Sequence, residues 1–554
     1  MGTPWVLAVD LGTGGPKVGA VALDGTILAT AFTPVPTVAT DDGGAEQDVT
    51  LWWDGIRDGV RGFLDAGVVR GQDLHAVGLT SQWMSMVAVD GDGAPVGPCL
   101  MWSDRRGEHE VTAAIGGPVA GLAPDVIVRA VRYTGMVPLP SGEDPLGHEL
   151  FLRAHRPDQY QRARALLEPV DYLGLRFTGV IAATPASQFT AALVDNRPGR
   201  VPRYVPSLVR RYGRNPALLP PLRPTASVLG TVAPSVAAEL GVAPSAPVVC
   251  GAPDFFAAHL GSGATDWYEP HLAVSTTSWL TCAVPYKKTD PWHLVGSLPG
   301  LTRGTYLTIN DQSSAGYCLA WWRDRLGEAT SLVGGQVPDY DALLTAAAAV
   351  SPGSDGVMFL PWLRGEHTPV DDAAARAAFV DLHATHTTAA MTRAVLEGVA
   401  LNGRWLLRSV EAYIGRRMPV IRMLGGGAVS ELWCQIYADV LGRPIERVRD
   451  PVYAQMRGAA LMAQVGLGER TTHETSACVQ VDRRFDPSAT SADLYADLFT
   501  EFTRLYRSLR RHHRRRNGAA APAVSPRVGG GASPSSGHHR RRTPNRSSTS
   551  PPRR

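Results

Sequence analysis

Apolar residues near the start of the chain form two short runs separated by glycines. Val6–Val9 leads into a carboxylate, Asp10, and a second run, Val18–Leu23, ends at the turn dipeptide Asp24-Gly25. Apolar runs of this length, bounded by glycine and a hairpin dipeptide, predict two strands joined by a tight loop. Walker and dinucleotide-binding sites have a helix after their glycines, so the pattern indicates neither of them.

The loop between these two predicted strands carries groups that suit phosphate and metal. Gly12 and Gly14 allow backbone N–H groups to approach a phosphate, while Thr13 adds a hydroxyl and Lys17 a positive charge. Asp10 adds a carboxylate for a phosphate-bound Mg²⁺. The pattern predicts a phosphate loop, and an ordinary hairpin with a flexible turn remains an open alternative.

A spacing of three to four residues between apolar side chains predicts helices further along the chain. It runs through residues 49–64 and again through 390–407. Two stretches, 126–152 and 196–224, are rich in Pro, Gly and Arg, so we expect loops or irregular insertions there. Strand-like apolar runs occupy 76–80, 86–90, 272–277 and 306–309.

Three consecutive glycines, Gly425, Gly426 and Gly427, follow another strand-like run and precede a helical period. Ser430 is suited to cap this predicted helix, which covers 432–441 and ends before a further glycine. A glycine loop that leads into a helix offers a flat approach for the base or ribose of a nucleotide. A plain strand-to-helix turn does not need three glycines.

Composition indicates a globular protein of two or three domains. The chain has 554 residues, of which 44% are hydrophobic, and no apolar run has the roughly 18 residues that a transmembrane helix needs. The N-terminus leads straight into a predicted strand without a signal-peptide pattern. The six cysteines are scattered and form no CxxC pair, which favours buried, reduced thiols. We therefore expect a cytoplasmic protein with no membrane partner.

The net charge of +3 is unevenly distributed. From Arg507 to the end the chain has 13 Arg and no Asp or Glu, so the remainder is acidic and is not expected to bind nucleic acid. Residues 512–554 are rich in Arg, Pro, Ser and Gly and lack a core pattern, which predicts a disordered tail. The tail is either a solvated extension, the interpretation we favour, or a basic arm for nucleic acid or anionic membranes.

Motifs in a fixed order along the chain resemble the FGGY family of carbohydrate kinases, and among them the xylulokinase-like branch. The resemblance extends from about Val6 to about Gly468. It implies an α/β fold of two actin-like (ribonuclease H-like) domains around a central cleft, with residues 1–255 on the sugar side and 256–511 on the nucleotide side. The motifs are DLGTGGPK (10–17), GLTSQWMSMVAVD (78–90), MWSDRR (101–106), GAPDFFAAHLGSG (251–263), VSTTSW (274–279), LPWLRGEHTP (360–369), GGGA (425–428) and RGAALMAQVGLG (457–468).

The resemblance assigns Asp254 as the catalytic base. A sugar hydroxyl is a poor nucleophile, so a carboxylate must take its proton as the bond to phosphorus forms. An N-cap before a helix at Phe255 is the structural alternative for this Asp, and both roles are compatible. Where the family usually has Gly-Gly-Gly-Asp-Asn, this chain has Ala252 and Pro253 in place of two glycines and Phe255 in place of Asn.

The resemblance also implies ATP and Mg²⁺ as cofactors, with Asp10 at the metal. A second phosphate loop contains Thr276 and Thr277, although the family usually has Gly at the first of these positions, and a strand with Thr on one face is the alternative. The implied nucleotide-binding residues are Gly12, Thr13, Gly14, Lys17, Thr276, Thr277, Gly425, Gly426, Gly427 and Ser430.

The implied acceptor is a ketopentose, of which xylulose is the best single candidate. Met84 stands where xylulokinases have His, which places the chain on a divergent branch. Core packing is the alternative role for Trp83 and Trp102. The implied partners are therefore a small-molecule sugar and ATP, in a monomer or homodimer. The implied sugar-side residues are Gln82, Trp83, Met84, Trp102, Asp104, Asp254 and Phe255.

Two other functions fit the same scaffold. One is a non-catalytic sensor of sugar or nucleotide, and the other is an actin- or Hsp70-like ATPase that acts on protein partners. The presence of Asp10, Lys17 and Asp254 disfavours a sensor. The tryptophan-rich sugar-side segments disfavour the ATPase.

Overall fold

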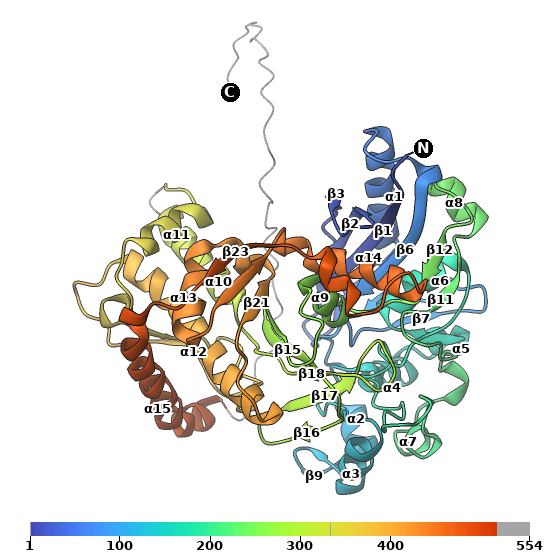
Figure 1. Cartoon of the computed structure of the whole chain (residues 1–554). Coiled ribbons are helices and arrows are strands. Elements are labelled where there is room, and N and C mark those ends of the chain that lie inside the picture. Colours follow the sequence, from blue (N-terminus) through green and yellow to red (C-terminus); the bar gives the residue numbers. More distant parts are fainter. Residues whose placement is uncertain (1, 333, 518–554) are drawn as a thin grey trace, which may run out of the picture.

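Two β-sheets, each with its own helices, lie side by side in the computed structural model, which describes residues 2–332 and 334–517 (Figure 1). The first sheet has the order β11-β12-β6-β1-β2-β3, and β13 pairs with the end of β6. Its strands are β1 (Trp5–Gly12), β2 (Gly15–Ala22), β3 (Ile27–Phe32), β6 (Leu74–Ser81), β11 (Val228–Thr231), β12 (Pro247–Val249) and β13 (Ala252–Pro253).

The second sheet repeats this plan. Its order is β16-β17-β18-β15-β14-β21-β22-β23. In both sheets an antiparallel hairpin (β1–β2 or β14–β15) adjoins two parallel strands (β6 and β12, or β21 and β22) and an antiparallel edge strand. The strands are β14 (Pro270–Val274), β15 (Ser278–Val284), β16 (Thr289–Asp290), β17 (Val295–Pro299), β18 (Tyr306–Ile309), β21 (Ile421–Leu424), β22 (Ile445–Val448) and β23 (Val481–Phe485).

Smaller elements surround these two sheets. The short strands are β4 (Val38–Ala39), β5 (Ala45–Gln47), β7 (Val87–Val89), β8 (Cys99–Leu100), β9 (Gly116–Val119), β10 (Ala165–Leu167), β19 (Met358–Leu360) and β20 (Ala378–Val380). The helices on the first lobe include α1 (Val49–Asp65), α2 (Glu108–Ile115), α5 (Pro157–Arg162), α6 (Pro169–Thr178) and α8 (Pro234–Leu240). Those on the second lobe include α10 (Gly316–Ser331), α11 (Tyr340–Ala348), α12 (Thr388–Ile414) and α13 (Glu431–Leu441).

Most of the predicted elements are confirmed, among them the first hairpin, α1, α12 and α13. The prediction of irregular loops is wrong for much of 126–152, whereas 196–224 is irregular as predicted apart from one short helix and a 3-10 turn. The chain forms α3 (Pro124–Tyr133), α4 (Pro145–His155) and α7 (Pro206–Arg211) there, and each of them has proline at its first turn. Proline suits that position because its missing N–H has no partner in a helix start, so these prolines begin helices instead of interrupting them.

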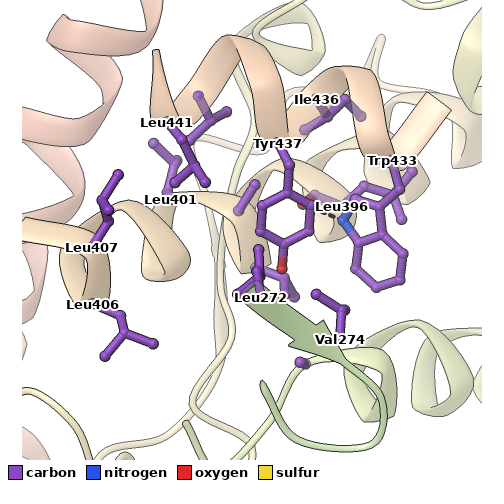
Figure 2. Packing of buried hydrophobic residues seen from close by; sticks show 14 of the residues in the cluster. Leu272, Val274, Leu396, Leu401, Leu406, Leu407, Trp433, Ile436, Tyr437 and Leu441 are labelled. Carbon is purple, nitrogen blue, oxygen red and sulfur yellow. Dashed lines mark hydrogen bonds between the residues drawn. The ribbon is translucent and has the colours of Figure 1, made fainter. Parts of the chain in front are cut away.

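Helices α12 and α13 cover one face of the second sheet (Figure 2). Leu396, Trp433 and Tyr437 are buried against Leu272 and Val274 of β14. The Trp433 indole N–H donates to the carbonyl oxygen of Leu396 at 3.1 Å, so this large side chain is packed without losing a hydrogen bond. All six cysteines are free and buried, as the sequence predicts.

A third hydrophobic cluster joins the two lobes. It contains side chains of β1 and β6, of β14 and β15, and of two helices, α9 (Asp254–Ser262) and α14 (Ala454–Gly466). The helices cross at glycines: a Cβ on Gly261 would lie 1.7 Å from the carbonyl oxygen of Ala454, and one on Gly458 would lie 1.8 Å from that of Ala257. The backbones of α9 and α14 are therefore in direct contact.

The last described helix, α15 (Ala492–Asn517), extends into the predicted tail. Residues 512–517 are helical, so the prediction of disorder is wrong for them: His513 is buried, and the Asn517 side chain donates to the carbonyl oxygen of Ala374 at 3.0 Å. The rest of the tail, 518–554, lies outside the described residues. No helix in the described part of the chain is long and apolar enough to cross a membrane.

Replacing Gly458 with alanine is expected to destabilise the protein by about 3 kcal/mol or more, because the added methyl group overlaps backbone that cannot move aside. Gly62, in the exposed part of α1, is the matched control, since a Cβ there has nothing within 4 Å. Gly62→Ala should leave the free energy of unfolding equal or up to about 1 kcal/mol higher. Denaturant unfolding of both variants measures their free energies of unfolding. Equal midpoints would contradict the close backbone contact between α9 and α14 at Gly458.

Truncation tests the end of α15. A chain that ends at Asn517 should melt at the same temperature as the full chain, because the sequence beyond it offers few apolar side chains for packing. A chain that ends at Arg511 loses the buried His513 and the Asn517 hydrogen bond, and we expect its melting temperature to fall by roughly 1–3 °C. Calorimetry measures the melting temperatures of the two truncated chains. Equal melting temperatures would contradict the packing of residues 512–517 against the rest of the protein.

Candidate active site

The first hairpin presents a buried carboxylate beside a lysine. Asp10 of β1 is the cross-strand partner of Lys17 on β2, and the Lys17 Nζ lies 3.4 Å from Asp10 Oδ2. Asp10 is almost fully buried, whereas Lys17 is partly exposed. The two-residue turn that links the strands is Thr13-Gly14, and the Thr13 carbonyl oxygen accepts a hydrogen bond from the Gln47 side chain at 2.7 Å. We call Gly12–Gly15 the phosphate turn.

Asp254 lies at the same edge of the sheet as Asp10. Asp10 pairs with Thr80 on β6, and Thr80 pairs in turn with Ala252 on β13, whose carbonyl oxygen accepts from the Thr80 hydroxyl at 2.8 Å. Asp254 follows two residues later as the first residue of α9. The alternative role of Asp254 as the helix cap does not hold, because Pro253 occupies the N-cap position, and the carboxylate remains available for another role.

Burial raises the pKa of Asp254 to about 7, and the negative charge of Asp10 adds to the rise. The backbone N–H of Phe255 and the charge of Lys17 act in the opposite direction. A carboxylate with a pKa near neutrality is a stronger proton acceptor than an ordinary Asp, as a general base requires.

The second hairpin presents the other candidate phosphate loop. The predicted strand over 272–277 is shorter than expected, because β14 ends at Val274 and residues 275–277 form the turn to β15. The turn leaves Thr276 exposed, and the carbonyl oxygens of Ser275 and Thr276 accept the N–H groups of Gly316 and Ala315 at 2.7 and 2.9 Å. These bonds fix the loop against the start of α10.

The triple glycine lies against this second loop. Gly425 has φ +90°, and a Cβ there would lie 2.5 Å from the carbonyl oxygen of Val274; Gly427 is equally crowded, whereas Gly426 is open to solvent. Ser430 caps α13 by accepting the N–H of Trp433 at 3.1 Å, as predicted. The structure therefore brings the two segments of the predicted nucleotide side together.

The segment Gln82–Ser85, which we call the acceptor loop, follows β6 directly. The Gln82 N–H donates to the carbonyl oxygen of Leu11 at 2.8 Å, so the loop begins beside the phosphate turn. Trp102 adds a second link, because its indole N–H donates to the Thr13 hydroxyl at 3.1 Å. The predicted sugar-side and phosphate-side segments of the first lobe are thus in contact.

Aromatic rings form a wall next to Asp254. Trp83 stacks between Phe189 and Phe255 with ring centroids 6.3 and 6.2 Å away, and Phe255 contacts Trp279 at 6.0 Å. Trp279 follows the second phosphate loop, so the wall spans both lobes. Phe255 has no polar group at a position where the amide of the usual Asn would offer two donors and an acceptor.

Asp104 is already engaged within the protein. Its carboxylate is buried, pairs with Arg106 at 2.5 Å and accepts the N–H of Ala45 at 3.0 Å. Arg106 also pairs with Glu46 and lies over the ring of Phe151. This arrangement makes Asp104 a support for the acceptor side in the structure.

Sequence reasoning misses two groups that hold the candidate site together. Gly316 packs directly on the second phosphate loop. The small residues that precede Gly316 are the only feature of the sequence that indicates such close packing. Glu168 binds the acceptor loop, but its place before Pro169 resembles any helix start. Both depend on contacts between segments far apart in the sequence.

The residues present fit a magnesium ion that arrives with ATP. In the described part of the chain no three His, Cys, Asp or Glu residues converge on one metal position. Asp10, a buried carboxylate whose cation partner is 3.4 Å away, can supply one ligand, and phosphate oxygens and water usually complete the shell of Mg²⁺.

Comparison with known proteins decides the family. Residues 5–261 match the N-terminal domain and residues 281–467 the C-terminal domain of the FGGY family of carbohydrate kinases. The chain belongs to this family. The family identifies an ATP-using phosphotransferase with an alcohol group as acceptor, and the resemblance seen in the motifs is confirmed.

Individual relatives of this FGGY kinase agree on the fold. A xylulose kinase of Staphylococcus epidermidis is 26% identical over 91% of this chain and 97% of its own, and an autoinducer-2 kinase of Klebsiella pneumoniae is 25% identical over 91% and 93%. The structure of ligand-bound xylulose kinase from Lactobacillus acidophilus superposes with a TM-score of 0.77 at 22% identity, over 91% of this chain and 98% of that one. The predicted two-domain α/β fold is confirmed.

We expect kcat/KM of this FGGY kinase to rise with pH and level off above an apparent pKa near 7, because only ionised Asp254 can accept a proton. Asp254→Asn should keep the melting temperature and ATP binding but lower kcat by about 10²-fold or more. Steady-state kinetics from pH 5.5 to 9 on the best acceptor measures both effects. A flat profile, or near-normal kcat in Asp254→Asn, would exclude Asp254 as the base.

Proposed function

We propose that this FGGY kinase transfers the γ-phosphate of MgATP to a hydroxyl of a ketopentose, with xylulose the best single candidate. The observation that carries the proposal is Asp254, a half-buried carboxylate with a pKa near 7 that follows β13, at the end of β6 and close enough to Asp10 and Lys17 for their charges to act on it. The relatives named xylulose kinase supply the candidate sugar.

In this mechanism Asp254 accepts the proton of the sugar hydroxyl while the hydroxyl oxygen bonds to the γ-phosphorus and ADP leaves. Thr13 and Lys17 in the first lobe and Thr276 and Thr277 in the second would bind the phosphate oxygens, and Asp10 would hold the magnesium ion, which would neutralise part of the phosphate charge. Positioning and charge neutralisation contribute most of the rate in phosphoryl transfer. Gly426, the open member of the triple glycine, leaves room for the adenosine, while Gly425 and Gly427 allow the loop to pack on Val274.

The acceptor lies between Gln82, Trp102 and the aromatic wall. Trp83 is the partly exposed ring beside buried Phe255 and presents apolar surface, which suits the C–H face of a sugar. Gln82 supplies an amide, and Met84 supplies no polar group where a histidine is usual. With few polar contacts available from Met84, Phe255 and the engaged Asp104, we expect a small acceptor that is recognised by shape as much as by its hydroxyls.

A panel of pentuloses, hexuloses, polyols and aldonates tests the proposal through ADP release. We expect a ketopentose to stimulate release at least 10-fold over the rate without sugar, because the base has no proton to take until an acceptor binds. Asp254→Asn is the control and should abolish the stimulation. Turnover without sugar would instead indicate an ATPase, and binding without turnover would indicate a sensor.

A further inference from the structure

Glu168 binds the acceptor loop directly. Its Oε1 accepts the N–H of Met84 and its Oε2 accepts the N–H of Ser85, both at 3.2 Å, and the Thr190 hydroxyl also donates to Oε1 at 3.2 Å. The side chain is buried, with 3% of the residue exposed. Met84 has φ +65°, a conformation that non-glycine residues adopt only when their surroundings impose it. The two hydrogen bonds hold the loop where that conformation occurs.

Ser85 transmits this constraint to the phosphate turn. Its hydroxyl donates to Gln82 Oε1 at 3.1 Å and accepts the N–H of Trp102 at 2.9 Å. The indole N–H of Trp102 then donates to the Thr13 hydroxyl at 3.1 Å. A continuous series of hydrogen bonds thus runs from Glu168 through two sugar-side residues to the turn that faces the phosphates.

We propose that Glu168 is a positioning residue that sets the acceptor loop and, through Ser85 and Trp102, aligns the bound sugar with the phosphate turn. The inference rests on the proposed function, since it gives the loop the task of holding the acceptor. A small displacement of the loop moves the reacting hydroxyl relative to both Asp254 and the phosphate, and phosphoryl transfer is sensitive to such misalignment.

Asp171, in the first turn of the helix that Glu168 precedes as the N-cap residue, offers a matched control. It is buried like Glu168 and lies one turn along α6, but its hydrogen-bond partner is Gln188, 3.4 Å away, instead of the acceptor loop. A general loss of α6 stability would follow from substitution at either residue. An effect specific to sugar alignment follows only from substitution at Glu168.

The experiment compares Glu168→Gln, Ser85→Ala and Asp171→Asn in the full chain. Glutamine keeps the size of the side chain but has one acceptor oxygen, so one loop N–H faces an amide donor. We expect Glu168→Gln to raise the KM for the best acceptor about 10-fold and to lower kcat, with the KM for ATP within twofold. Ser85→Ala adds no atoms that could clash, and it should likewise raise the acceptor KM and lower kcat. Asp171→Asn should leave both constants within twofold of the wild-type values.

Hydrogen–deuterium exchange of the peptide that covers residues 82–86 provides a second measurement that needs no turnover. Glu168→Gln should speed exchange there, and Asp171→Asn should not. Unchanged exchange, an unchanged acceptor KM in both test variants, or equal effects in Asp171→Asn would overturn the positioning role. Wild-type protein without sugar-dependent ADP release would refute the proposed function instead, and the exchange measurement would still decide whether Glu168 holds the loop.

Discussion

The direct contact between the backbones of α9 and α14 is the constraint on which the rest of the molecule depends. Glycines at 261 and 458 let the two helices approach until backbone meets backbone, and a Cβ on Gly78 of β6 would likewise lie 2.2 Å from the carbonyl oxygen of Ala459. The pair is therefore held close to the first sheet, and its hydrophobic cluster continues into β14 and β15 of the second. Since Asp254 is the first residue of α9, this packing sets where the candidate base lies relative to both lobes.

Repetition of one sheet plan gives each lobe one of the two candidate phosphate loops. Each lobe supplies the turn of its first hairpin, Thr13-Gly14 in one and residues 275–277 in the other. The acceptor loop follows the end of β6, and Gly425 follows the end of β21. These segments lie at the carboxyl ends of the central parallel strands, the edge at which open α/β sheets commonly bind their ligands.

Several of these elements could be predicted from local features of the sequence. The first hairpin, α1, the cap of α13 at Ser430 and the buried, free cysteines follow from apolar period, turn residues and composition. The prolines at 145 and 206 misled the prediction, because the same residue interrupts a helix interior and begins a helix at its first turn. Glu168 and the aromatic wall of Phe189, Trp83, Phe255 and Trp279 could not be predicted, because both are made of side chains that meet only through tertiary packing. The alternative role of Asp254 as a helix cap does not hold, because Pro253 occupies the N-cap position.

The most direct measurement of the central claim is a crystal structure with the acceptor sugar, Mg²⁺ and a non-hydrolysable ATP analogue. The account predicts that a carboxylate oxygen of Asp254 lies within about 2.6–3.2 Å of the hydroxyl that faces the γ-phosphorus, with the phosphates between the phosphate turn and residues 275–277. A complex in which every acceptor hydroxyl lies beyond reach of Asp254, or in which another carboxylate takes that place, would contradict it.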